Sequence, residues 1–328
     1  MTALIETDVE AIASNVERMR SLAGSETIVV VKANGYGHGA VLAAEGALRG
    51  GAVQLAVADI GEALALRRAG VRKPLLAWLH SAHADFAAAR DADIEVGVSS
   101  LRQLEQAGEC GSLRIHLKFD TGLGRNGIPF AEWDAVIGRA HALQSAGRLR
   151  VAGLMSHLAG AGSEADRRQH ERFAQALAAS ERLAAEVTHL CASSGTLAAV
   201  SGSLVRFGVS AYGLDPDGHD ANGSVARDLG LRPALRLTAP VRGGRLAYGY
   251  RHGLMTTDVP VLVGDRRIAI ARAGADESQL ESPVDGTAVL IGSAEHGEPT
   301  AGEWAVAAGT INYEIVTRLA PSIERRAA

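Results

Sequence analysis

Eight short apolar runs, rich in Val, Ile, Leu and Ala, recur along the first two thirds of the chain. Helical patterns such as AVLAAEGALRGG (40–51) and IGEALALRRAG (60–70) separate most of them. Alternating strands and helices over about 210 residues predict a (β/α)8 barrel of the TIM type, in the α/β class. The predicted barrel strands are TIVVVK (27–32), LAVA (55–58), PLLAWL (74–79), IEVGVS (94–99), RIHLKF (114–119), VAGLMS (151–156), VTHLCA (187–192) and SLVRFGVSAYGL (203–214).

The pattern changes after LDPDGHD (214–220), a turn-rich segment. Apolar runs then follow one another without helical patterns between them, which predicts a small C-terminal β domain. We place the barrel at residues 1–219 and the β domain at 220–328. The predicted strands of the β domain are LRLTAPV (235–241), VPVLV (259–263), RRIAIARA (266–273), TAVLIG (287–292) and EWAVAAG (303–309).

The N-terminal segment predicts a short strand followed by an amphipathic helix. Thr7 and Glu10 form a T-x-x-E capping box ahead of the apolar positions Ile12, Val16 and Met19. The short strand is a candidate for pairing with the second domain.

Composition narrows the classes of partner. The 328 residues are 47% hydrophobic and carry a net charge of −4, from 33 basic and 37 acidic residues without charged blocks. We therefore expect a small-molecule ligand and neither nucleic acid nor a membrane as partner. The N-terminus lacks a signal-peptide pattern, which favours a cytoplasmic protein.

No metal site is expected. Cys110 and Cys191 lie far apart and have no partner spacing typical of zinc or of a disulfide framework. The two histidines of HSAH (80–83) have only Asp85 near them as a further ligand type, so we interpret this segment as a loop.

Candidate chemistry lies where the predicted barrel strands end. Active sites of such barrels form at the C-terminal ends of the strands. Taken singly, Arg125 or Arg206 is also typical of a surface charge or a structural ion pair, and His157 is typical of a structural hydrogen bond. Together they predict a positive pocket suited to a phosphate or carboxylate. The residues of this predicted pocket are Lys32, Lys118, Arg125, His157 and Arg206. Asp120, Ser193 and Ser194 also follow the ends of predicted strands.

Five motifs, read in order, resemble the bacterial alanine racemases of the pyridoxal phosphate (PLP) barrel family. They are spread over most of the chain, from residue 30 to residue 315: VVKANGYGHGA (30–40), LKFDTGLGRN (117–126), VRFGVSAYGLDP (205–216), LAYG (246–249) and GTINYEI (309–315). The resemblance implies an isomerase that interconverts L-alanine and D-alanine and supplies D-alanine for cell-wall peptidoglycan.

The resemblance also assigns cofactor contacts. It implies that Lys32 carries PLP as a Schiff base, which explains a lysine at the end of a buried strand. Arg206 corresponds to the arginine that faces the pyridine nitrogen, where a permanent cation should keep that nitrogen unprotonated and make the ring a weaker electron sink. The implied phosphate contacts are Tyr36, Ser194, Gly208, Val209 and Tyr313.

Racemisation needs a base on each face of Cα, and the resemblance implies Lys32 on one face and Tyr248 of a second subunit on the other. The active unit is then a homodimer with shared sites. Arg206 and His157 are the expected source of phenolate stabilisation. Arg125 corresponds to an arginine near the substrate carboxylate, and Lys118 to a lysine that is often carbamylated in this family.

The second domain departs from the family pattern. It is short, and its tyrosine-containing entrance segment and Met-Asp-Gln segment have no clear counterpart. Arg272 aligns where an entrance tyrosine is expected. Two alternatives therefore stay open: a racemase for another, larger or acidic amino acid, and a non-catalytic PLP carrier or sensor. Tyr248 argues against the carrier, which needs no second base.

Overall fold

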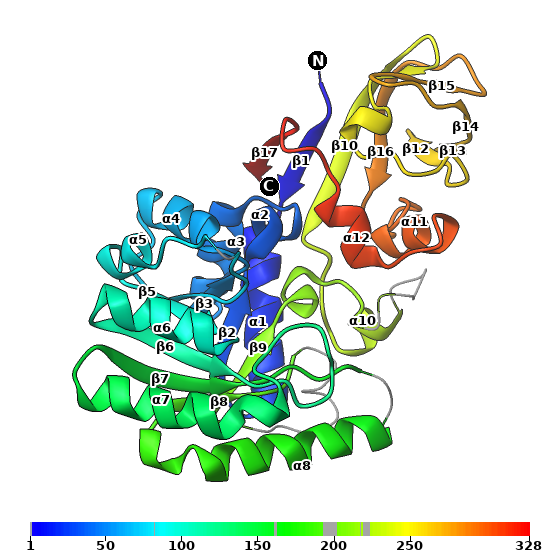
Figure 1. Ribbon diagram of the computed structural model, residues 1–328. Helices are drawn as coiled ribbons and strands as arrows, with labels where there is room; N and C mark the ends of the chain where they lie inside the picture. Colours follow the sequence, from blue (N-terminus) through cyan, green and yellow to red (C-terminus); the bar gives the residue numbers. More distant parts are fainter. Residues whose placement is uncertain (1, 82, 161–162, 193–201, 217, 219–223) are drawn as a thin grey trace. The chain divides into compact units, whose positions relative to one another are not determined.

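The computed structural model describes the chain except for residues 1, 82, 161–162, 193–201, 217 and 219–223 (Figure 1). Its described residues form two compact units. The first contains residues 1–19, 33–51 and 209–328, and the second contains 20–32 and 52–208. The predicted boundary at residue 219 lies outside the described residues.

A closed barrel of eight parallel strands forms the second unit, as the sequence predicts (Figure 1). Each of the eight predicted segments overlaps one barrel strand, with boundaries that differ by a few residues. The strands are largely buried Val, Ile, Leu and Ala, as expected of parallel strands covered by helices. They are β2 (Glu26–Val30), β3 (Gln54–Val57), β4 (Leu75–Ala77), β5 (Ile94–Val98), β6 (Leu113–Lys118), β7 (Leu149–Met155), β8 (Val187–His189) and β9 (Leu204–Phe207).

Helices follow the barrel strands, and several begin at side-chain caps. Asp59 accepts a hydrogen bond from the Glu62 amide at the start of α4 (Ile60–Arg68), and Ser100 accepts one from the Gln103 amide at the start of α6 (Leu101–Cys110). The unit also contains the short helix α5 (Phe86–Asp91) and the longer helices α7 (Trp133–Ser145) and α8 (Ser163–Ala179). No helix in the described part of the chain is long and apolar enough to cross a membrane.

The first unit is built on a mixed sheet. Its order is β13-β12-β16-β10-β11-β15-β14, and β1 (Leu4–Thr7) lies antiparallel to β10 and parallel to β17. Strands from both ends of the chain therefore complete one sheet. The remaining strands are β10 (Leu235–Arg242), β11 (Arg245–Leu246), β12 (Val261–Val263), β13 (Arg266–Ile268), β14 (Ile270–Arg272), β15 (Ser278–Leu280), β16 (Gly286–Ile291) and β17 (Glu324–Ala327).

The prediction of a strand at EWAVAAG (303–309) is wrong, because this segment belongs to α11 (Ala301–Ala307). The Thr300 side chain caps the helix by accepting a hydrogen bond from the Glu303 amide at 3.0 Å. Thr300 and Glu303 have the T-x-x-E spacing, so the sequence contained the helix signal. Trp304 donates from Nε1 to the Leu290 carbonyl and so ties α11 to β16. RRIAIARA (266–273) contains two strands, β13 and β14, in place of one.

The predicted capping box at Thr7 and Glu10 is also wrong, although the helix exists as α1 (Val9–Ala23). Asp8 provides the cap, because its Oδ1 accepts a hydrogen bond from the Ala11 amide at 2.7 Å. Thr7 belongs to β1, and its hydroxyl donates to the His38 carbonyl at 2.6 Å.

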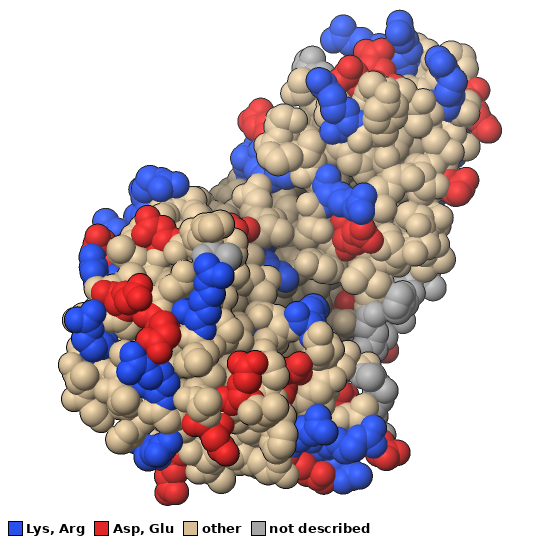
Figure 2. All heavy atoms as spheres, viewed as in Figure 1, with Lys and Arg blue, Asp and Glu red and all other residues tan. Residues whose placement is uncertain are grey.

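The surface charges follow the mixed composition: in the face shown in Figure 2, Lys and Arg are interspersed with Asp and Glu.

Candidate active site

Five predicted site residues lie at or just beyond the ends of barrel strands. Lys32 follows β2, Lys118 is the last residue of β6, Arg206 lies in β9, and His157 follows β7 by two residues. Arg125 lies in the exposed loop after β6. The parallel barrel collects these ends on one rim.

Four cations surround His157. Its pKa falls to about 3, first because of burial and then because of the charges of Arg206, Arg125, Lys118 and Lys32. All four must lie near the imidazole to act on it, so the structure brings the five predicted residues together. His157 is therefore neutral at pH 7 in the chain alone.

The Arg206 guanidinium is buried and held on several sides. Nη1 donates to His189 Nδ1 at 2.8 Å and to the His189 carbonyl at 2.9 Å. Nη2 donates to the carbonyls of Ser156 and Leu190 and lies 3.1 Å from His157 Nδ1. Burial lowers the pKa of Arg206 to about 10, so it remains a cation at pH 7. A cation held by this many contacts keeps one orientation.

Lys118 is also buried, and its Nζ donates to the Asn126 carbonyl. Burial lowers its pKa to about 8, and the charges of Arg206 and Arg125 act in the same direction. About a tenth of the Lys118 side chains are then neutral at pH 7, and about half at pH 8.

The turn after Lys32 is left-handed. Ala33, Asn34 and Tyr36 have φ values of 52°, 54° and 50°, and Gly35 lies between them at 63°. Left-handed backbone costs roughly 1–2 kcal/mol for each residue that carries a Cβ. Strain of this kind clusters at functional sites. The glycines at 35, 37 and 39 suit this turn, because glycine adopts positive φ at little cost.

Two predicted phosphate contacts, Tyr36 and Tyr313, lie together in the first unit. Their ring centroids are 5.1 Å apart, and Tyr212 packs against Tyr36 at the same distance. Ser193 and Ser194 lie outside the described residues. Gly208 is the single residue between β9 and the short helix η3 (Val209–Tyr212), which Val209 begins.

Tyr248 is buried in the first unit, and its hydroxyl donates to the His252 carbonyl at 3.1 Å. Burial raises the pKa of Tyr248, and Arg325 opposes the shift only in part. A base needs the opposite shift. Arg272 is exposed at the end of β14.

Comparison with known proteins decides the family. The family described as "Alanine racemase, N-terminal domain" matches residues 7–216, and "Alanine racemase, C-terminal domain" matches residues 230–327. An alanine racemase from Beutenbergia cavernae is 40% identical over 97% of this chain and 96% of its own length. The chain belongs to the alanine racemase family.

Solved structures of alanine racemases share the whole fold. The enzyme from Streptomyces lavendulae matches with a TM-score of 0.91 and 34% identity, covering 100% of this chain and 97% of that one. The Bartonella henselae alanine racemase with covalently bound pyridoxal phosphate has a TM-score of 0.84 over 100% of this chain and 99% of its own, and at 21% identity its likeness concerns the fold. The predicted family, the barrel with a smaller β domain and the isomerase class are confirmed.

Sequence reasoning missed three residues that this member of the alanine racemase family places beside the site. His189 contacts Arg206, His116 contacts His189 at 2.8 Å, and Glu95 contacts His116 at 2.8 Å. All three lie within predicted strands, so only the periodicity of inward-facing positions could have indicated them.

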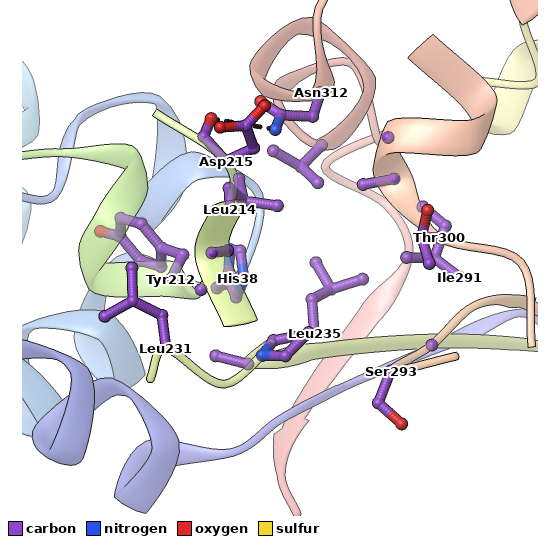
Figure 3. Close-up of a pocket in the computed structure, with 18 of the residues that line it drawn as sticks. His38, Tyr212, Leu214, Asp215, Leu231, Leu235, Ile291, Ser293, Thr300 and Asn312 are labelled. Atoms are coloured by element: carbon purple, nitrogen blue, oxygen red, sulfur yellow. Dashed lines mark hydrogen bonds between the residues drawn. The ribbon is translucent and has the colours of Figure 1, made fainter. Parts of the chain in front are cut away.

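A cavity of about 50 Å³ lies in the first unit, and its lining includes His38 and Tyr212 (Figure 3). His38 Nδ1 donates to the carbonyls of Tyr36 and Gly35, so Nε2 is the acceptor of the neutral ring. Burial lowers the pKa of His38 to about 4. Two buried polar atoms of residues that line the cavity, His38 Nε2 and Asn312 Oδ1, have no hydrogen-bond partner among the described residues. The cavity has room for about three to five water molecules, and its lining offers these two acceptors.

Proposed function

We propose that this protein interconverts L-alanine and D-alanine with pyridoxal phosphate, as a cytoplasmic homodimer that supplies D-alanine for peptidoglycan. The observation that carries the proposal is the group of cations that act on His157, among which Arg206 is held in one orientation by its hydrogen bonds. Membership of the alanine racemase family supports the reaction and its substrate.

The donor set fits this cofactor. A dianionic phosphate and a ring oxygen require cations and hydrogen-bond donors, which the barrel rim provides. When bound, pyridoxal phosphate supplies an electron sink that makes the substrate Cα proton acidic. The residues proposed to hold it are Lys32 by a covalent bond, Arg206 at the pyridine nitrogen, and Tyr36, Ser194, Gly208, Val209 and Tyr313 at the phosphate.

Arg206 suits the role at the pyridine nitrogen because an arginine has only donors and remains charged. The N–H groups at Nη1 and Nη2 already donate to backbone carbonyls and to two histidines. These contacts fix the direction of the guanidinium before any ligand binds. A donor in this position opposes protonation of the nitrogen and so limits the charge that the ring withdraws from Cα.

Lys118 is proposed to be carbamylated. The neutral amine is the form that reacts with carbon dioxide, and a pKa of about 8 makes it available near neutral pH. The amine nitrogen bonds to the carbon of carbon dioxide and releases a proton, so the product is a carbamate anion and the repulsion between Lys118 and Arg125 becomes an attraction. Arg125 would then be held for contact with the substrate carboxylate.

Two bases are proposed, Lys32 on one face of Cα and Tyr248 of the partner subunit on the other. His157 Nδ1 accepts from Arg206, so its proton is on Nε2. That N–H can donate to a phenolate. Bringing a tyrosine pKa from about 10 to about 7 needs roughly 4 kcal/mol of phenolate stabilisation. Because burial in its own chain raises the pKa of Tyr248, the partner's cations must supply this and more.

The lysines allow a direct test. The chain contains only three, Lys32, Lys73 and Lys118. The protein is incubated with pyridoxal phosphate, reduced with borohydride and mapped by peptide mass spectrometry. We expect label on Lys32, and we expect Lys32→Ala to lose both the visible absorbance band and racemisation. Lys73→Ala, at an exposed position, is the matched control and should keep both.

Substrate choice is read in the same preparation. Racemisation of a panel of amino acids is followed by separating the enantiomers, and alanine should be fastest. A faster acidic or larger amino acid would overturn the alanine assignment and leave the chemistry. Label on Lys118 or Lys73, or a protein that takes up no cofactor, would overturn the chemistry itself.

A further inference from the structure

A chain of hydrogen bonds crosses the interior of the barrel from Arg206. Arg206 Nη1 lies 2.8 Å from His189 Nδ1, His189 Nε2 lies 2.8 Å from His116 Nδ1, and His116 Nε2 lies 2.8 Å from Glu95 Oε2. Both imidazoles are fully buried. The four residues come from four different strands, β9, β8, β6 and β5, and are far apart in the sequence.

A glycine makes the middle contact possible. β7 lies between β6 and β8 in the barrel, and Gly153 on β7 is paired with His116. A Cβ at Gly153 would lie 2.3 Å from His116 Nδ1. The backbone φ of Gly153 is not in the left-handed region, so the close approach of His116 is the structural reason for glycine here.

The donors and acceptors allow one arrangement of protons with neutral rings. Arginine only donates, so His189 Nδ1 accepts and the proton of His189 is on Nε2. That proton is donated to His116 Nδ1, which places the His116 proton on Nε2, facing the Glu95 carboxylate. A proton added to His116 would set two N–H groups against each other at the next contact. The chain of bonds is therefore polarised from Arg206 towards Glu95.

The acidic end is anchored in turn. Glu95 Oε1 accepts from Arg114 Nε at 2.8 Å, and Gln54 Nε2 donates to Oε2 at 2.8 Å. Arg114 also binds Glu186 at 2.8 Å. Burial raises the pKa of Glu95, but the hydrogen bonds that His116 and Arg114 donate, together with the charge of Arg114, outweigh it and lower the pKa below its usual value. Glu95 is an anion at pH 7 and a strong acceptor for His116.

We propose that Glu95 and His116 are positioning residues that fix the proton of His189 and, through it, the orientation of Arg206 toward the cofactor. This inference rests on the proposed function, which places Arg206 at the pyridine nitrogen. Glu95 acts from three contacts away, through the tautomer of each imidazole. The carboxylate does not touch the reacting atoms.

The first test is independent of the cofactor. Histidine labelled with ¹⁵N reports by NMR which ring nitrogen carries the proton. In the cofactor-free protein, His116 and His189 should each show a single Nε2–H tautomer. Glu95→Gln keeps the side-chain size and removes the charge, so at least one ring should become a mixture of tautomers. Glu105→Gln is the control, because Glu105 pairs with Arg139 on the surface at 2.7 Å.

The second test uses the loaded enzyme. Glu95→Gln should lower kcat about tenfold, equivalent to about 1.4 kcal/mol, with KM changed less than twofold, and should shift the cofactor absorbance maximum. Gly153→Ala breaks the His116–His189 contact without altering charge and should reproduce the shift and the loss of kcat. Gly153→Ala also provides the test of the proposal if Glu95→Gln fails to fold.

The outcomes separate the two proposals. Fixed tautomers lost in Glu95→Gln, with kcat and absorbance unchanged, would overturn the positioning role while Lys32 labelling still supports the proposed function. Wild-type rings that already show mixed tautomers would overturn the polarised chain. Failure of Lys32 to take the label would overturn the proposed function, and the NMR result would stand apart from it.

Discussion

Replacing Gly37 with alanine should destabilise the turn after Lys32 through two separate costs. Gly37 has φ 82°, so alanine must adopt left-handed backbone at about 1–2 kcal/mol. An added Cβ would also lie 2.0 Å from the carbonyl oxygen of Val316. That oxygen belongs to the backbone at the end of α12 (Asn312–Thr317), so relief requires a shift of more than about 1 Å, and overpacking of this kind costs about 1–3 kcal/mol. The sum is about 2–5 kcal/mol.

Gly297 is a matched control in the same unit. It has the same φ of 82°, and nothing lies within 4 Å of a Cβ built on it. Gly297→Ala therefore carries only the backbone cost of about 1–2 kcal/mol. The difference between the two variants isolates the close approach to Val316 and should be about 1–3 kcal/mol.

The assay is urea unfolding of both variants and the wild type, with the slope fitted for each. With a slope of about 2 kcal/mol per molar urea, the midpoint of Gly37→Ala should lie about 0.5–1.5 M below that of Gly297→Ala. Equal midpoints for the two variants would refute the role of Val316. A Gly37→Ala protein as stable as the wild type would refute the left-handed turn as well.

Three further predictions follow from single contacts. Asp8→Ala should lower the free energy of unfolding by about 1 kcal/mol, because it removes the acceptor for the Ala11 amide. Asp8→Asn keeps an acceptor and should lose much less stability. Equal losses in both variants would contradict the cap. The pKa of His38, about 4, lies below the unfolded value of 6.5, so its stability contribution is fully present above pH 6.5 and is lost as pH falls to 4. The loss is about 3 kcal/mol, and the urea midpoints of wild type and His38→Gln should converge on acidification; a constant gap would count against a buried neutral ring. Tyr248→Phe should keep the cofactor absorbance and slow racemisation in both directions, and an unchanged rate in both would remove Tyr248 as a base.

Much of the candidate site was visible in the sequence because chemistry and strand ends coincide there. Lys32, Lys118, His157 and Arg206 each stand at or near the end of an apolar run, and parallel strands of a barrel end on one rim. Knowing the barrel therefore suffices to bring them together. The depressed pKa values of Lys118 and His157 needed the structure, because burial and the charges of side chains distant in sequence cause them.

Two predictions from local sequence were wrong because the segment allowed more than one structure. Thr7 and Asp8 can both cap α1, and the choice fell to Asp8 because Thr7 is committed to β1 and to the His38 carbonyl. EWAVAAG suits a strand or a helix by composition, and the Thr300 cap with the Trp304 contact to β16 decided for the helix. In each case a contact made outside the segment decided the structure, either with an adjacent residue or with a distant part of the chain.

The sequence by itself determined the eight barrel strands, the family and the residues that bear charge at the rim, because periodicity and motifs are local properties of the chain. Only the tertiary structure decided that the two ends of the chain join one sheet through β1 and β17. It also decided that Glu95 reaches Arg206 through His116 and His189. Those contacts join residues that are far apart in sequence, and their distances and proton arrangement exist only once the barrel has closed.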